Sequence, residues 1–61
     1  KAVKWYRRAA AQGDPQGLYA LGRALLKGEG ISQDRDRAVF YLRKAAEAGN
    51  EEARALLQKE L

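Results

Sequence analysis

Apolar residues recur at helical spacing in two stretches of the chain. In residues 2–13 the small and aromatic positions fall at i, i+3, i+4, i+7, i+8 and i+11, which is one stripe on an α-helix of about 3.6 residues per turn. Each stripe carries two bulky residues followed by two alanines. Because a lone helix cannot bury such a face, the pattern predicts helices that pack on neighbours. The second stretch places the same stripe at Ala38, Tyr41, Leu42, Ala45, Ala46 and Gly49.

The two stretches are near copies of one another. Residues 2–14 read "AVKWYRRAAAQGD" and residues 38–50 read "AVFYLRKAAEAGN", and they align without a gap at an offset of 36 residues. The shared features are an aromatic, a basic pair, two alanines, a glycine and a capping residue. A fixed offset of this length is typical of stacked structural repeats.

Glycine and capping residues predict where the helices end. Gly13 and Gly49 suit the left-handed conformation just past a helix end, where a Cβ is penalised. Asp14 is then an N-cap followed by Pro15 at the first helical position, and Asn50 repeats the cap. The pattern predicts a helix over residues 15–27 and another from residue 51 to the end.

Leucines and glycines share the helix expected over residues 15–27. Leu18, Leu21 and Leu25 line one face. Gly17 and Gly22 lie in the helix interior, where glycine costs about 1 kcal/mol relative to alanine, so we expect both to mark close contacts between helices.

The segment "KGEGISQD" breaks this helix. We expect Ile31 to fold back as an apolar plug, and Ser32 or Asp34 to cap a third helix over residues 34–48. The Gly-Glu-Gly run lacks the spacing of a phosphate-binding loop and follows a helix, so we interpret it as a turn.

Length and composition limit the chain to one small domain held by packing. It has 61 residues with no cysteine, histidine or methionine, which removes disulfides and the usual zinc ligands. No apolar run approaches the roughly 20 residues that a membrane span needs. The chain opens within a helical pattern, so we expect an excised or processed segment. The composition leaves both cytosol and periplasm open.

The sequence offers no catalytic constellation. Without histidine or cysteine the usual nucleophile–base pairs are absent, and the scattered carboxylates suit caps and helix first turns. We therefore expect no enzyme activity, no cofactor and no metal site.

Basic residues give the first binding hypothesis. The net charge is +4, and the pair Arg7–Arg8 recurs as Arg43–Lys44 on equivalent helices. Together with Lys4 they form a candidate face for an acidic polymer, and the alternative is a solvated outer surface. We expect Trp5, Tyr6 and Tyr41 to be packed, which makes them poor stacking platforms and nucleic acid an unlikely partner.

Residues 20–53 resemble one unit of the Sel-one-like repeat (SLR) family, which is related to the tetratricopeptide repeats. Residues 2–13, with the pair Trp5–Tyr6, resemble the end of a preceding unit. Leu25 and Gly17 depart from the family pattern, which usually has tyrosine and alanine there. Gln58 stands at the position that matches Gly22. The matching positions are Leu21, Gly22, Gly28, Gly30, Ile31, Asp34, Ala38, Tyr41, Leu42, Ala45, Ala46, Gly49 and Ala53.

The resemblance implies an all-α fold, a right-handed α/α superhelix of antiparallel helix hairpins with four helices here. Residues 1–13 would be the second helix of a preceding repeat, residues 14–49 one full repeat, and residues 50–61 a C-terminal capping helix. The polar residues Gln58, Lys59 and Glu60 motivate the cap, since the end of a repeat stack needs a polar outer face. The absence of cysteine sets the chain apart from the secreted bacterial branch that carries cysteine pairs.

The resemblance also implies a scaffold or adaptor that binds a peptide or protein partner on its concave face. In such stacks the first helix of each hairpin lines that face, which carries Tyr19 and Arg23, four residues apart. Leu26 is a further candidate, and the alternative for Tyr19 is packing against the adjacent turn. A purely structural cap or a self-association element is the third hypothesis. The partner-binding candidates are Gln16, Tyr19, Arg23, Lys27 and Lys59.

Overall fold

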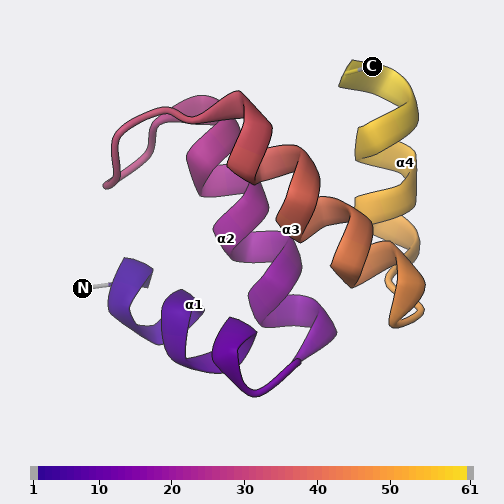
Figure 1. Cartoon of the computed structure of the whole chain (residues 1–61), viewed down its shortest axis with the longest axis horizontal. Helices are drawn as coiled ribbons and strands as arrows, with labels where there is room; N and C mark the ends of the chain where they lie inside the picture. The colour runs from indigo at the N-terminus through magenta and orange to yellow at the C-terminus, as the bar shows by residue number, and fades with distance from the viewer. Residues whose placement is uncertain (1, 61) are drawn as a thin grey trace.

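The computed structural model describes the backbone of residues 2–60 and the side chains of residues 4–60. This part of the chain contains helices and no strand (Figure 1). The prediction of an all-α fold is confirmed, and each helix boundary lies within two residues of its expected place. The helices are α1 (Ala2–Ala11), α2 (Pro15–Lys27), α3 (Arg35–Glu47) and α4 (Glu51–Glu60).

Consecutive helices reverse direction and stack side by side (Figure 1). Helix α2 packs against α1 and α3, and α3 also packs against α4. The start of α3 is tied to the end of α4 because Arg35 Nη2 donates a hydrogen bond to the Glu60 carbonyl oxygen at 2.8 Å. The most extensive packing is therefore on two helices for α2 and α3, and on one helix for α1 and α4.

Small residues form the centre of the core. Ala38, Ala45 and Ala53 are fully buried, and Leu42 is 1% exposed. Leucines from α2 pack with them in two clusters. Leu18 shares one cluster with Leu42, Ala45 and Ala53, and Leu21 shares the other with Ala38. The alanine stripes predicted from the sequence are thus the surfaces through which the helices approach.

Both glycines in the interior of α2 lie at close helix contacts, as predicted. A Cβ on Gly22 would lie 2.8 Å from Leu42 Cγ, which is closer than carbon atoms approach in proteins. A Cβ on Gly17 would meet the Ala9 side chain and lie 2.9 Å from the Ala10 backbone nitrogen. The two glycines therefore set the spacing of α2 from α3 and from α1.

The turns after α1 and α3 have the same hydrogen bonds. The Asp14 N–H donates to the Ala9 carbonyl at 3.0 Å, and the Asn50 N–H donates to the Ala45 carbonyl at 2.9 Å. The glycine before each of these residues has a positive φ, which is 79° at Gly13 and 100° at Gly49. This is the Schellman geometry, in which a left-handed residue ends the helix.

The residues after these glycines begin the next helix. Asp14 Oδ1 accepts a hydrogen bond from the Gln16 N–H at 2.9 Å, and Asn50 Oδ1 accepts one from the Ala53 N–H at 2.8 Å. The sequence repeat is thus also a repeat of backbone geometry. Both predicted caps are confirmed.

The loop between α2 and α3 is held from both ends. Asp34 Oδ1 accepts from the Arg37 N–H at 3.1 Å, so Asp34 rather than Ser32 caps α3. Gln33 Nε2 donates to the Leu26 carbonyl at 2.8 Å. Ile31 is half-buried and packs against the cluster of Leu21, as the plug prediction required.

The prediction that Trp5 is packed is wrong. Its side chain is 57% exposed, whereas Tyr41 at the equivalent position of α3 is half-buried against both clusters. The reason is the number of neighbours. Helix α1 packs mainly on α2, which covers the side of Tyr6 and Ala9, while α3 packs on both α2 and α4. Trp5 lies at the edge of the stripe, beyond the reach of one neighbour.

Candidate partner-binding surfaces

Four of the five predicted partner-binding residues share one stripe of α2. Gln16, Tyr19, Arg23 and Lys27 are spaced three or four residues apart, so they follow one another along the helix surface. Gln16, Arg23 and Lys27 are exposed. Tyr19 is half-buried and packs against the cluster of Leu18, so the alternative considered for it, packing, describes part of its surface.

Lys59 and Leu26 stand apart from this stripe. Lys59 is exposed on α4, where it takes the position that Arg23 takes on α2. Its helix packs on α3, so the structure places it in a separate element from the other four residues. Leu26 is only 8% exposed and belongs to the core, so its suggested role in binding is wrong.

The predicted basic face is divided between α1 and α3. All five basic residues are exposed. Lys4, Arg7 and Arg8 line a depression of about 450 Å³ together with the exposed Trp5. On α3, the Lys44 Nζ lies 5.2 Å from the ring centroid of Phe40, which is 53% exposed. Arg43 and Lys44 line no part of the depression on α1.

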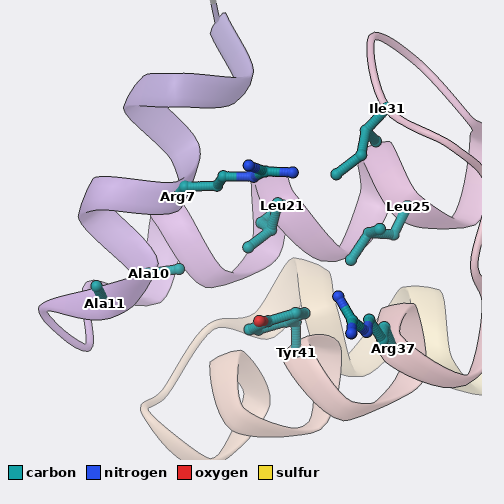
Figure 2. A pocket seen from close by; sticks show the side chains of 8 residues that line it. All are labelled: Arg7, Ala10, Ala11, Leu21, Leu25, Ile31, Arg37 and Tyr41. Atoms are coloured by element: carbon teal, nitrogen blue, oxygen red, sulfur yellow. The ribbon is translucent and has the colours of Figure 1, made fainter.

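A groove that the sequence did not reveal lies between α1, α2 and α3. Its volume is about 400 Å³. Figure 2 shows the guanidinium of Arg7 from α1 and that of Arg37 from α3 pointing into the same space, with the side chain of Ile31 directed into it from the loop. The lining residues are Arg7, Ala10, Ala11, Leu21, Leu25, Ile31, Arg37 and Tyr41.

The groove exists because α1 and α3 pack on two sides of α2. Ala10 and Ala11 are too short to fill the space on the α1 side, and leucines of α2 form its floor. The sequence contains these alanines and leucines, but it does not show that they face a common groove. That conclusion needs the relative placement of α1, α2 and α3.

The two guanidinium groups give the groove a positive rim. Arg37 Nε lies 3.6 Å from Asp34 Oδ2, and the Arg37 side chain is 74% exposed. This is the only ion pair recorded within residues 2–60, and an exposed pair of this kind contributes little to stability.

Other site types have no support in the described residues. Residues 2–60 contain no group of three or more acidic side chains placed to hold a metal ion. None of α1 to α4 is long and apolar enough to cross a membrane.

Comparison with models of known protein families identifies the family of the chain. The model of the Sel1 repeat matches it twice, at residues 1–14 and at residues 15–50, and these segments together cover well over half of the sequence. The chain belongs to the Sel1 repeat family. Sel1 repeats are all-α, tetratricopeptide-like solenoids that generally mediate protein–protein interaction.

This Sel1 repeat chain is also similar to a curated protein. Over 58 residues the chain is 44% identical to DAP3-binding cell death enhancer 1 from Rattus norvegicus. The alignment covers 95% of the chain and 11% of the rat protein, so the chain spans about a tenth of that relative. No solved structure matches the chain.

Proposed function

We propose that the chain is a protein–protein interaction module that binds a peptide segment of its partner along the exposed stripe of α2. Membership of a family of interaction modules supports this role. The stripe, which would lie on the concave face of a longer stack, presents Gln16, Tyr19, Arg23 and Lys27. Lys59, exposed on α4 at the position equivalent to Arg23, is proposed as a separate further contact. We infer no catalytic role, since the chain lacks histidine and cysteine.

The pair Tyr19–Arg23 carries the proposal. Tyrosine and arginine are frequent anchors of protein interfaces. Packing of Tyr19 against the Leu18 cluster limits the freedom of its ring before binding, which lowers the entropy lost on association. Arg23 is exposed and takes no part in the ion pair recorded within residues 2–60, so its guanidinium is open to a carboxylate of the partner.

The first partner to test is DAP3. The name of the rat relative describes that protein as DAP3-binding, and the chain is similar to about a tenth of it. We propose DAP3 as the partner of this chain.

Biolayer interferometry with immobilised DAP3 tests the proposal. We expect wild-type chain to bind, and Tyr19→Ala combined with Arg23→Ala to weaken binding at least about thirtyfold, as two interface anchors do. Arg54→Ala is the matched control, since it removes one exposed arginine from α4. Unchanged binding by the double variant would refute the α2 stripe as the binding surface. No binding by the wild-type chain would refute DAP3 as the partner.

We also propose that residues 50–61 cap the stack, after a preceding second helix in residues 1–13 and one full repeat in residues 14–49. At an offset of 36 residues, Arg54, Gln58 and Glu60 take the positions of three α2 residues that are buried, namely Leu18, Gly22 and Ala24. All three polar residues are exposed. A polar surface on α4 suits the end of a repeat stack.

The exposed indole of Trp5 favours a second candidate, binding of an acidic polymer at α1. Trp5 shares its depression with Lys4, Arg7 and Arg8, which supplies both a stacking surface and positive charge. Trp5 is the only tryptophan, so its fluorescence reports on this surface alone. Quenching by single-stranded oligonucleotide that falls steeply with salt supports this candidate, and an unchanged spectrum at low salt refutes it.

A further inference from the structure

We propose that the groove between α1, α2 and α3 is a second docking site, for a protein segment that presents an aliphatic side chain beside a carboxylate. The proposal goes beyond the interaction surface on the α2 stripe. It uses different residues on the other side of the same helix.

The floor of the groove selects an aliphatic side chain. Leu21 and Leu25 are each 4% exposed there, and Ile31 is directed into the space from the loop (Figure 2). The volume of about 400 Å³ is enough for one or two side chains. Burying an aliphatic group there is favourable because it removes from water the apolar surface of the ligand and the exposed part of Ile31.

The rim selects a carboxylate. The guanidinium groups of Arg7 and Arg37 project toward the same space from opposite helices (Figure 2). Asp34 is the acidic group that faces Arg37, and it pairs with Nε, which leaves the terminal nitrogens of Arg37 as donors. Two cations and one carboxylate leave the rim positive. The hydroxyl of Tyr41 adds a neutral donor at the edge of the groove.

The groove and the α2 stripe can be occupied together. Successive residues of an α-helix are about 100° apart, so Leu21 and Arg23 lie on nearly opposite sides of α2. Leu25 and Arg23 are related in the same way. A partner on one surface therefore leaves the other open, and the two proposals can fail separately.

A peptide titration followed by amide NMR tests the groove. The probe is the terminally blocked peptide Gly-Glu-Leu-Glu-Gly, and the matched control replaces both of its glutamates with glutamine. We expect the acidic peptide to shift the amides of Leu21, Leu25 and Ile31 while Arg23 stays in place, and the control peptide to bind at least about fivefold more weakly. No shift, or shifts confined to the α2 stripe, would overturn the proposal.

Variants assign the interaction to the rim. Arg7→Gln and Arg37→Gln should each weaken binding of the acidic peptide at least about fivefold. Arg54→Gln, the same change as at Arg7 made at an exposed arginine of α4 outside the groove, should leave the binding unchanged. Equal losses from Arg7→Gln and Arg54→Gln would show attraction to overall charge and refute the site.

A stability measurement separates docking from a covering role. If the stem of Arg7 only shields the leucines from water, Arg7→Gln lowers the melting temperature and leaves peptide affinity unchanged, which refutes the proposal. Tyr41→Phe removes one hydroxyl and keeps the packed ring. We expect it to weaken the acidic peptide by about two- to fivefold with an unchanged melting temperature.

Discussion

At the scale of single residues, the fold depends on positions occupied by glycine or alanine, where two helices pack closely. Gly17 and Gly22 bring α2 close to α1 and α3, and Ala38 and Ala45 are fully buried between helices. Larger residues there would push the helices apart. These positions were predictable because glycine inside a helix is unfavourable unless a close contact requires it.

Alanine substitutions at the two glycines test this contact. On an isolated helix Gly→Ala stabilises by about 1 kcal/mol. We expect the opposite here, a loss of about 1–3 kcal/mol in the free energy of unfolding, because an added Cβ overpacks the interface. Gly17→Ala should be the worse, since its Cβ would lie 2.9 Å from the Ala10 backbone nitrogen, whereas the nearest backbone atom to a Cβ at Gly22 is the Ala38 carbonyl oxygen at 3.1 Å.

Urea unfolding followed by circular dichroism measures the effect. Ala55→Gly on exposed α4 is the control, and it should lose only about the 1 kcal/mol of helix propensity. If Gly17→Ala and Gly22→Ala were both more stable than wild type, the close approach described above would be wrong.

Trp5 marks the limit of inference from single residues. Its position in the repeat equals that of Tyr41, and periodicity assigned both to the packed stripe. Tyr41 has α4 as an additional neighbour of its helix, and Trp5 lacks one. Sequence pattern identifies a side chain that can pack, but the number of helices around it decides whether it does.

At the scale of elements, local chemistry sets the helix boundaries. Gly13 and Gly49 end their helices in the left-handed conformation, and Asp14, Asp34 and Asn50 each accept a backbone hydrogen bond at the next helix start. These signals act within a few residues, so the bounds of α2 and α4 followed from the sequence. The groove did not, because its lining comes from three helices and a loop.

Asn50→Ala tests the element scale. Asn50 Oδ1 caps α4 through the Ala53 N–H, and its Nδ2 reaches the Pro15 carbonyl at a long 3.5 Å. We expect a loss of about 1 kcal/mol in the free energy of unfolding, with fraying concentrated in α4. Hydrogen exchange of the α4 amides measures the fraying. Asn50→Ser keeps a capping oxygen and should retain most of the stability, and equal losses from the two variants would contradict the capping role.

At the scale of the whole molecule, α2 is the central element. It packs on α1 and α3, forms the floor of the groove with Leu21 and Leu25, and carries Tyr19 and Arg23 on the other side. Helix α4 carries exposed polar residues at the positions that are buried in α2. The stack is therefore asymmetric along its length, and the cap proposal follows from that asymmetry.

Extension of the chain tests the cap. A second copy of residues 26–49 joined after Leu61 continues the repeat register and supplies a helix equivalent to α3. We expect no gain in melting temperature with the wild-type α4, because Gln58 stands where only glycine leaves room at α2. Replacing Arg54, Gln58 and Glu60 by Leu, Gly and Ala should allow docking and raise the melting temperature. An equal gain in both extended chains would contradict the cap.

The central claim is that the exposed stripe of α2 is an interaction surface, and amide NMR of the chain with saturating DAP3 tests it most directly. The account predicts shifts at Gln16, Tyr19, Arg23 and Lys27 that vanish in the Tyr19→Ala/Arg23→Ala variant while Arg54→Ala keeps them. Shifts confined to the residues around Trp5, or none on α2 at saturation, would contradict it.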